Sequence, residues 1–252
     1  MVRIILSGYS GKMGQTIRRI CAESSEFEIV AGIARDADDV PFPAFSQASQ
    51  CDIPGDVIID FSNASAVRQI LDYAVDTGTP VIICTTGISE EDNAAITAAA
   101  GKIAVFRSAN MSLGVNLLAR LIKKAADVLY GAGFDIEVLE KHHNLKVDAP
   151  SGTALLLADA ANEQLGGKLS YTYDRSGQRR QREHNELGLH ALRGGTIVGE
   201  HSVIFAGDDE VVELSHSAHS KAVFARGAVK AAAFLKGKPA GLYSMSDVLE
   251  YV

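Results

Sequence analysis

The sequence predicts an α/β protein whose N-terminal part is a doubly wound parallel sheet, followed by a second part with antiparallel or mixed strands. Two observations indicate this class. Short apolar runs alternate with segments of helical spacing through about the first 110 residues, the pattern of βαβ units. A glycine-rich turn directly follows the first apolar run, as in dinucleotide-binding folds. At ~150 residues per domain, a chain of 252 residues favours two domains.

The first half is expected to contain buried parallel strands, because its apolar runs are short and bounded by polar or glycine-rich segments. These strands are expected at residues 2–7, 27–34, 56–60, 80–84 and 103–106. Helices are expected after the first, third and fourth runs. The last of them covers 89–100, with Ser89 as its N-cap. The polar stretch 35–55, which contains Pro41 and Pro43, is interpreted as a loop.

The second half has a different pattern. Helices are expected over residues 112–130, from near Ser151 onward, and over 221–236. The run FDIEVLE at 134–140 alternates apolar and acidic residues, which predicts a strand with one wet face. Residues 196–206 and 210–218 flank Gly-Asp-Asp and predict a β-hairpin. The polar stretch 170–188 is interpreted as a mobile loop.

Composition and charge argue against several classes of protein. The formal net charge of −7 argues against nucleic-acid binding, which usually needs a basic face. No apolar run approaches the ~18 residues that span a membrane, and the apolar run near the N-terminus is too short for a signal peptide. The three cysteines stand at unrelated spacings and indicate neither a disulfide framework nor a zinc site. We therefore expect a cytoplasmic protein with no metal, nucleic-acid or membrane partner.

Gly8, Gly11 and Gly14 lie in the turn after the first strand and at the start of the following helix. Glycines allow backbone N–H groups to approach a pyrophosphate, and the helix N-terminus adds positive partial charge. Ser10 occupies the place of the middle glycine of the usual pattern. The turn predicts a dinucleotide site, and a tight structural turn is the alternative.

Two further strands are followed by short polar segments, DFS at 60–62 and TTG at 85–87. Both segments are expected at the carboxyl ends of parallel strands, where ligands of this fold bind. Ordinary helix capping by serine and threonine is the alternative interpretation, and from composition alone it is the stronger one.

Residues 140–153 (EKHHNLKVDAPSGT) are the part of the chain richest in chemistry. His142, His143 and Lys146 stand in a short predicted loop, and Ser151 begins the next helix. The free N–H groups of that helix start and the lysine are two cationic features that suit a substrate with two carboxylates. A histidine can donate a proton near neutral pH. The alternatives are a solvated loop with an ordinary N-cap, and metal binding by the adjacent histidines, which lacks a suitably spaced carboxylate.

Two other groups of residues carry weaker signals. His201, His216 and His219 lie on or beside the predicted hairpin and are interpreted as core or surface histidines. Arginines are concentrated in the predicted mobile loop, at Arg175, Arg179, Arg180 and Arg182. They either close over an anionic substrate or remain solvated.

Six motifs follow one another along the chain. They are GYSGKMG at 8–14, IDFS at 59–62, CTTG at 84–87, KHHNLKVDAPSGTA at 141–154, GEH at 199–201 and GLYSMSDVL at 241–249. In this order and spacing they resemble the 4-hydroxy-tetrahydrodipicolinate reductase (dihydrodipicolinate reductase) family of bacterial lysine biosynthesis. The resemblance spans nearly the whole chain, and the HHxxKxDAPSGT element is its most specific part.

The resemblance implies an N-terminal Rossmann domain, completed by the C-terminal helix and tail, and a central α+β domain with a mixed sheet. Residues 1–110 and 220–252 are then expected to form the dinucleotide-binding domain. Residues 111–219 are expected to form the substrate-binding and oligomerisation domain of a homotetramer. The implied reaction is the NAD(P)H-dependent reduction of a cyclic dicarboxylate, 4-hydroxy-tetrahydrodipicolinate, to tetrahydrodipicolinate in the diaminopimelate route to lysine.

The resemblance also implies roles for individual residues. His142 is the expected proton donor, with Lys146 as carboxylate binder or second acid. His143 and the turn of Ser151, Gly152 and Thr153 are expected to hold substrate carboxylates. The expected cofactor-binding residues are Gly8, Tyr9, Ser10, Gly11, Lys12, Met13, Gly14, Arg35, Phe61, Ser62, Cys84, Thr85, Thr86, Gly87, Ser108, Asn110 and Met111.

The cofactor preference depends on the end of the second strand. Position 34, about twenty residues after the glycine turn, is alanine, where an acidic residue often binds the adenosine ribose. Arg35 and Lys12 can pair with a 2′-phosphate, whereas three acidic residues follow soon after, Asp36, Asp38 and Asp39. We expect NADPH to be preferred over NADH, with activity on both.

Two other functions compete with this interpretation. Another two-domain NAD(P) oxidoreductase, such as an amino-acid dehydrogenase, would share the glycine turn but would not need two anion-binding features at 142–153. A catalytically silent NADP-binding regulator would tend to have lost His142 or Lys146, and both are present.

Overall fold

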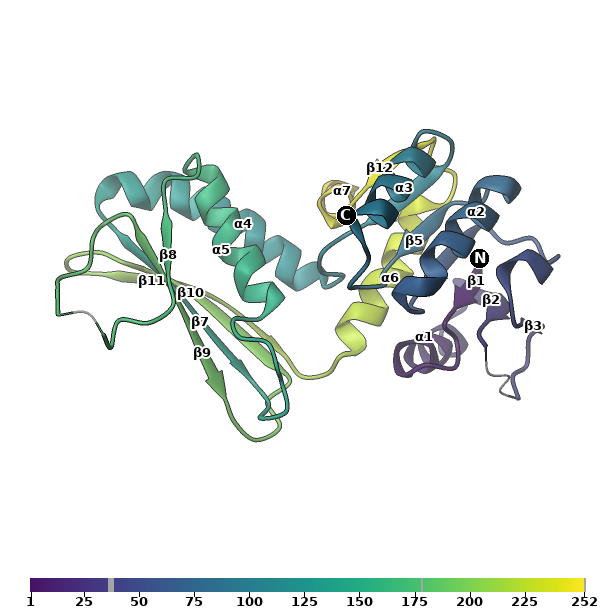
Figure 1. Ribbon diagram of the computed structural model, residues 1–252, viewed down its shortest axis with the longest axis horizontal. Coiled ribbons are helices and arrows are strands. Elements are labelled where there is room, and N and C mark those ends of the chain that lie inside the picture. The colour runs from purple at the N-terminus through teal and green to yellow at the C-terminus, as the bar shows by residue number, and fades with distance from the viewer. Residues whose placement is uncertain (36–38, 178, 252) are drawn as a thin grey trace. The chain divides into compact units, whose positions relative to one another are not determined.

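The computed structural model describes residues 1–35, 39–177 and 179–251. The chain divides into two compact units (Figure 1). Unit 1 comprises Met1–Ser112 and Ala222–Val252, and unit 2 comprises Leu113–Lys221. Each unit has its own β-sheet and its own hydrophobic core, so each has the organisation of a domain.

Unit 1 contains a seven-stranded sheet in which all the paired strands are parallel. The strands are β1 (Val2–Ser7), β2 (Phe27–Ile33), β3 (Ala44–Phe45), β4 (Val57–Asp60), β5 (Val81–Ile83), β6 (Ala104–Arg107) and β12 (Gly241–Tyr243). Their order across the sheet is β12-β6-β5-β4-β1-β2-β3. The winding changes direction at β1, which pairs with β2 on one side and β4 on the other. In such sheets ligands bind at this switch point, outside the carboxyl ends of the strands.

Helices cover both faces of this sheet. They are α1 (Lys12–Ala22), α2 (Val67–Thr77), α3 (Glu90–Ala100), α6 (Ala222–Leu235) and α7 (Met245–Tyr251), with short 3₁₀ turns at Ala48–Gln50 and Ala64–Ala66. Helix α1 packs on α6, and α2 packs on α3; the two pairs lie on opposite faces (Figure 1). The C-terminal segment returns to unit 1 and adds α6, β12 and α7 to it. The predicted class, a Rossmann-type sheet completed by the C-terminal segment, is confirmed.

Unit 2 is a five-stranded mixed sheet with two helices on one face (Figure 1). The strands are β7 (Asp135–His142), β8 (Ser170–Thr172), β9 (Glu186–Arg193), β10 (Gly199–Ala206) and β11 (Val211–Ala218), in the order β11-β10-β7-β9-β8. Strand β10 is antiparallel to β7 and β11, whereas β9 is parallel to β7 and β8. The helices are α4 (Leu113–Leu129) and α5 (Gly152–Gln164), with a 3₁₀ turn at Tyr130–Ala132. The predicted hairpin is confirmed as β10–β11.

Strand β7 shows why one face of this sheet is dry. Ile136 and Val138 are buried in the core under α4 and α5, whereas Asp135 and Glu137 alternate with them and are partly exposed. The same alternation continues on β10 and β11. The predicted strand with one wet face is therefore present, and its wet face is the one opposite the helices.

The interpretation of residues 170–188 as a mobile loop is wrong, because β8 and the start of β9 lie within this segment. Three of its arginines are bound to carboxylates of the same unit. Arg182 contacts Asp135 at 2.5 Å and Glu137 at 2.8 Å, and Arg180 contacts Glu186 at 2.6 Å. Arg175 also contacts Glu137 and Glu186. These ion pairs tie the segment to the sheet, so the three arginines are held by carboxylates of unit 2.

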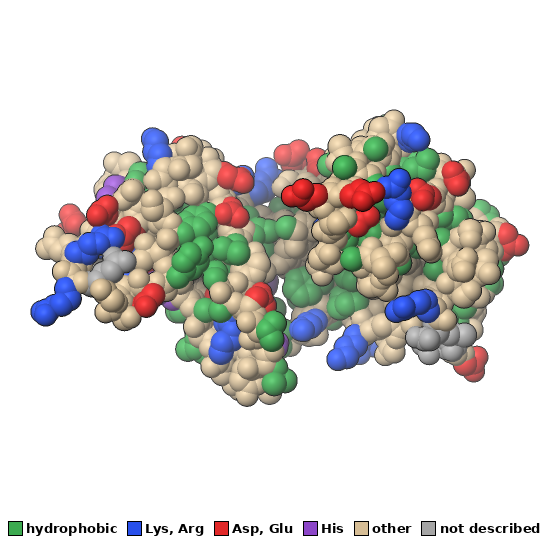
Figure 2. Space-filling model, in the orientation of Figure 1, with side chains coloured by type: hydrophobic (Ala, Val, Ile, Leu, Met, Phe, Trp, Pro, Cys, Tyr) green, Lys and Arg blue, Asp and Glu red, His purple; other side chains and the backbone are tan. Residues whose placement is uncertain are grey.

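One shorter correction concerns unit 1, and two observations concern the surface and the helices. The segment 35–55, interpreted as a loop, contains β3 and a 3₁₀ turn; β3 is only two residues long and pairs with the end of β2. On the face shown in Figure 2, basic and acidic side chains of the described residues are interspersed. Among the described residues, no helix combines the length and the apolar character needed to cross a bilayer.

Candidate active site

The glycine turn after β1 lets three backbone segments pack closely: the turn itself, the end of β4 and the start of α1. Gly8 has φ of +77°, and a Cβ on it would lie 2.5 Å from the carbonyl oxygen of Phe61. A Cβ on Gly14 would lie 2.2 Å from the carbonyl oxygen of Gly8, so α1 packs directly against the turn. Gly11, the N-cap of α1, offers no side chain to the helix start, and the first turn of α1 holds no acidic residue. The N-terminus of α1 is therefore open to an anion.

A cavity of about 310 Å³ lies at the carboxyl ends of β1, β2 and β4. The predicted cofactor-binding residues among its lining are Gly8, Ser10, Gly11, Arg35, Phe61 and Ser62. Ala34 also lines it and brings no carboxylate, whereas Arg35 brings a guanidinium. Asp36 and Asp38 lie outside the described residues, and Asp39 is exposed. A cavity with a phosphate-compatible helix start and hydroxyl groups fits the adenosine side of a dinucleotide.

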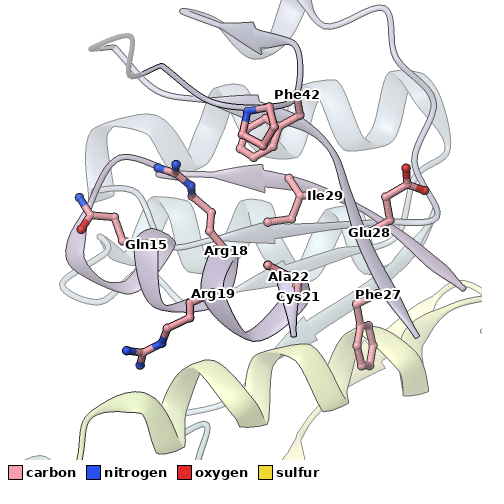
Figure 3. A pocket seen from close by; sticks show the side chains of 10 residues that line it. Gln15, Arg18, Arg19, Cys21, Ala22, Phe27, Glu28, Ile29 and Phe42 are labelled. Atoms are coloured by element: carbon pink, nitrogen blue, oxygen red, sulfur yellow. The ribbon is translucent and has the colours of Figure 1, made fainter. Parts of the chain in front are cut away.

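A second cavity, of about 610 Å³, lies between α1 and β2 (Figure 3). Arg18 and Arg19 extend from α1 over it, and Phe27, Ile29 and Phe42 form its apolar wall. None of the predicted cofactor-binding residues lines this cavity. We therefore place the candidate dinucleotide site at the glycine turn, where the predicted residues gather.

Thr85 is the most firmly held of the predicted residues beyond the glycine turn. Its Oγ1 donates to the buried carboxylate of Asp60 at 2.7 Å, and Arg107 donates to its carbonyl oxygen at 2.9 Å. Cys84 precedes it. Burial, assisted by the negative charge of Asp60, raises the pKa of the Cys84 thiol well above its ordinary value, so this side chain is neutral. A neutral, fixed edge after β5 suits the uncharged nicotinamide side of a cofactor.

The remaining predicted cofactor-binding residues lie at the start of α1 and in turns after strands. Tyr9 is fully buried with its ring edge-on to Phe42, so its backbone is the part available to a ligand. Ser108 donates to the carbonyl of Asn110 at 3.0 Å, and the Asn110 side chain accepts the N–H of Ser112 at 2.8 Å. The others are Lys12 and Met13 in α1, Thr86 and Gly87 after β5, and the buried Met111.

In unit 2, His142 is the last residue of β7. The prediction that it lies in a loop is wrong. The strand runs on because Lys141 pairs with Glu200 of β10, and Arg193 of β9 is the register partner of His142. His142 has the same parity along the strand as Ile136 and Val138 and therefore points to the helix-covered face. Its side chain is almost buried, with about a tenth exposed (11%).

Four hydrogen bonds converge on the fully buried carboxylate of Glu140, two residues before His142. The Nδ1 atom of His142 lies 2.6 Å from its Oε2, and the backbone N–H of Ser151 donates to its Oε1 at 3.0 Å. Arg193 donates to both oxygens at 2.7 Å. Burial alone would raise the pKa of Glu140, but the donors outweigh it and the pKa lies below its ordinary value. Glu140 is therefore ionised at neutral pH.

Ser151 begins α5 as the sequence predicted. Its Oγ accepts the N–H of Ala154 at 3.1 Å and lies 3.0 Å from Nε2 of His201. The ring of His201 stands edge-on to that of His142, with centroids 5.1 Å apart. Burial lowers the pKa of His201 to about 4, so the ring is neutral at neutral pH. His201, interpreted from the sequence as a core or surface histidine, is buried, and it lies beside Ser151 and His142.

The other predicted substrate residues lie around this helix start. Lys146 donates to both oxygens of Asp148, at 2.7 and 2.9 Å, and an ammonium group has a third donor for another anion. The Nδ1 atom of His143 is buried without a hydrogen-bond partner among the described residues. Gly152, in the first turn of α5, is exposed, and a Cβ on it would meet nothing within 4 Å. Thr153 follows it and is partly buried.

The sequence interpretation missed Glu140 and Arg193. A signal for Glu140 was available. In FDIEVLEKH, Glu140 has the same parity as Ile136 and Val138, so it is an acidic residue on the apolar face of its strand. Such a residue needs a buried partner. Arg193 gave no signal, because its pairing with Glu140 depends on the register of β9 beside β7.

The two units together define a class. Unit 1 has the sheet, glycine turn and cavity typical of a dinucleotide-binding protein, and unit 2 has an imidazole beside an N-capped helix start. A nicotinamide-dependent oxidoreductase acting on an anionic substrate needs both parts. The family described as "Dihydrodipicolinate reductase" matches the chain in two segments, its N-terminus over residues 2–111 and its C-terminus over residues 114–249. The chain belongs to this family.

Individual relatives agree with this assignment. A 4-hydroxy-tetrahydrodipicolinate reductase of Caldanaerobacter subterraneus subsp. tengcongensis is 50% identical over 250 residues, 99% of each chain. One from Clostridium tetani is 46% identical and covers 99% of this chain and 97% of the relative. Among solved structures, dipicolinate-bound dihydrodipicolinate reductase from Paenisporosarcina sp. TG-14 has a TM-score of 0.81 over 97% of both chains at 22% identity, which shows a shared fold.

Proposed function

We propose that this chain catalyses the NAD(P)H-dependent reduction of 4-hydroxy-tetrahydrodipicolinate to tetrahydrodipicolinate, in the diaminopimelate route to lysine. The observation that carries the proposal is the arrangement at 140–153, where an imidazole on a buried carboxylate lies next to an N-capped helix start. Relatives 46% and 50% identical over nearly the full chain bear the name of this activity. That likeness favours the reductase over the amino-acid dehydrogenase and the silent regulator.

The cofactor would be held by the glycine turn and by the cavity of about 310 Å³ at the carboxyl ends of β1, β2 and β4. Free N–H groups at the start of α1 would bind the pyrophosphate. When bound, the nicotinamide supplies the hydride. Arg35 lines the cavity and Ala34 brings no carboxylate, which supports a preference for NADPH over NADH.

The substrate carboxylates would be held by two cationic features of unit 2. The start of α5, with Ser151, Gly152 and Thr153, offers backbone N–H groups and hydroxyls. Lys146 offers the third donor of its ammonium, and its backbone N–H donates to the carbonyl oxygen of His143, three residues earlier. His142 would donate the proton that the reduction consumes. The solved relative with bound dipicolinate, a planar diacid, supports a dicarboxylate as substrate.

The same proposal includes a cytoplasmic homotetramer that assembles through the sheet of unit 2. The face of this sheet opposite α4 and α5 carries exposed apolar side chains, among them Leu192 (45% exposed) and Val211 (63% exposed). Burial of such side chains against other copies would stabilise an oligomer. Sedimentation equilibrium would give four times the chain mass of 26.7 kDa if this is right, and the mass of one chain if it is wrong.

The direct test is a reductase assay. The purified chain is mixed with NADPH and the cyclic condensation product of pyruvate and aspartate semialdehyde, and NADPH oxidation is followed. We expect turnover that requires both compounds. Oxidation of amino acids in place of this reaction would support the amino-acid dehydrogenase. NADPH binding without any turnover would support the silent regulator.

A further inference from the structure

We propose that Glu140 is a positioning residue, whose carboxylate decides which ring nitrogen of His142 delivers the proton. The inference rests on the proposed role of His142 as proton donor and adds a residue to it. The Oε2 atom of Glu140 lies 2.6 Å from the Nδ1 atom of His142 and forms a hydrogen bond with it. It is fully buried, so no water competes for this contact.

The hydrogen bond fixes the position of one proton. An ionised carboxylate only accepts hydrogen bonds, so the Nδ1 atom of His142 must carry a hydrogen to make this contact. A neutral imidazole has one N–H, and the Nε2 atom is therefore bare when His142 is neutral. When His142 is protonated, the additional proton is the one on Nε2. The pair with Glu140 thus makes Nε2 the atom that gives and regains the proton.

Arg193 keeps Glu140 in the ionised state that this argument needs. Its two terminal nitrogens each lie 2.7 Å from a different carboxylate oxygen, a bidentate geometry that is strong and directional. Arg193 is the residue opposite His142 on β9, so the same strand pairing places all three groups. The N–H of Ser151 occupies a further acceptor site at 3.0 Å. One carboxylate therefore ties the candidate proton donor to the start of the anion-binding helix.

Gly199, the first residue of β10, lies next to the Nε2 side of the ring, where a residue with a side chain would crowd it. A Cβ on Gly199 would lie 3.0 Å from the Nε2 atom of His142, closer than ordinary contact. The charged and titratable groups that face His142 are Glu140 on its own strand, Arg193 on β9 and His201 on β10. Neither Arg193 nor His201 is hydrogen-bonded to Nε2 in this structure, which leaves that atom for a substrate.

The proton count then closes. The 4-hydroxyl group and one hydrogen of a neighbouring ring carbon leave as water, and the unsaturated ring then takes up one hydride, supplied by the cofactor, and one proton. The Nε2–H bond of the imidazolium breaks, its electron pair stays on Nε2, and the proton goes to the reduced substrate. The ring changes from charge +1 to neutral, Nδ1 keeps its hydrogen, and Glu140 keeps its charge. A proton from solvent restores the imidazolium for the next turnover.

Glu140→Gln tests the inference, because it keeps the shape of the side chain and removes the charge. We expect kcat to fall ~100-fold, the usual size for losing a general acid, while the KM for NADPH stays within about twofold. Glu186→Gln is the matched control. Glu186 is also nearly buried in this sheet and bound by Arg175 and Arg180, but these contacts lie away from the candidate site. It should lose stability and keep kcat within about twofold.

The pH profile separates positioning from general loss of structure. Wild-type kcat should fall at alkaline pH, where the imidazolium is lost. Without the neighbouring carboxylate this limb should move to lower pH in Glu140→Gln. A merely structural role would scale kcat equally at all pH values and leave the limb in place.

The outcomes distinguish this inference from the proposed function. Full activity of His142→Ala would refute the proposed proton donor itself. Loss of activity in His142→Ala, with more than half of kcat and an unmoved pH limb in Glu140→Gln, would overturn the inference alone. If Glu140→Gln does not fold, ¹⁵N NMR of the wild-type histidines decides. Neutral His142 should carry its hydrogen on Nδ1, and a hydrogen on Nε2 would overturn the inference.

Discussion

The candidate sites of the two units are built from different parts of the chain. In unit 1 the site is made by backbone, since Gly8 and Gly14 let the turn, β4 and α1 approach within contact distance. In unit 2 it is made by buried side chains, since Glu140, Arg193 and His142 form one hydrogen-bonded group. A backbone site is damaged by adding atoms, whereas a buried charged group is damaged by removing one partner. The predictions below use this difference.

The largest effect is expected at His142. His142→Ala removes the proposed proton donor and should lower kcat by ~100-fold or more, because general acids contribute about that factor. The affinity for NADPH should not change, since the glycine turn belongs to the other unit. Steady-state kinetics give kcat, and calorimetry gives the NADPH affinity. Retention of more than half of the wild-type kcat would make His142 a structural residue.

The next largest effect is expected from adding one methyl group in unit 1. Gly14→Ala would place a Cβ 2.2 Å from the carbonyl oxygen of Gly8, so α1 or the turn must shift, at a cost of about 1–3 kcal/mol in the free energy of unfolding. NADPH affinity should fall with it. Gly101→Ala is the control, because its Cβ would be 3.4 Å from its nearest neighbour. Denaturant unfolding and calorimetry measure both quantities, and equal behaviour of the two variants would contradict the backbone argument.

The difference between a site built from backbone and a site built from buried side chains also explains how much of each could be predicted from the sequence. The glycine turn and apolar strands of unit 1 are local patterns, so the sheet and the dinucleotide site followed from adjacent residues. Strand β9 was missed because its residues follow a polar, arginine-rich segment whose order comes from ion pairs with β7. Arg193 was missed with it. His142 and Ser151 were found from one motif, but His201 of β10 and Arg193 of β9, which support Ser151 and Glu140, come from far along the chain.

A third prediction concerns the pH dependence of stability. The pKa of His201 is about 4 in the folded chain, below the ordinary value of 6.5, so the unfolded chain binds more protons between these values. Stability therefore falls as the pH falls through this interval. From pH 7 to pH 5 the wild type should lose about 2 kcal/mol more than His201→Gln, at 1.36 kcal/mol per pKa unit. Denaturant unfolding at both pH values measures this, and equal losses would show that His201 is not buried as a neutral ring.

The smallest effect is expected at Arg35, which lines the cavity of unit 1. Arg35→Ala should lower kcat/KM for NADPH about tenfold, ~1.4 kcal/mol in transition-state binding, because one charge-assisted contact to the 2′-phosphate is lost. The NADH reaction should stay nearly intact. If the wild-type enzyme prefers NADH tenfold or more, this expectation is wrong, and one of the aspartates after Arg35 binds the adenosine ribose instead.

The most direct measurement of the central claim, that the two units hold two ligands by separate means, is sequential calorimetry on wild type and Lys146→Ala. NADPH is titrated first, and pyridine-2,6-dicarboxylate is then titrated into the saturated protein. We predict that the wild type binds both ligands. Lys146→Ala should bind NADPH as the wild type does and bind the diacid about tenfold or more weakly, because it lacks one ammonium contact to a carboxylate. A wild type that fails to bind the diacid, or a variant that weakens both ligands equally, would contradict the claim.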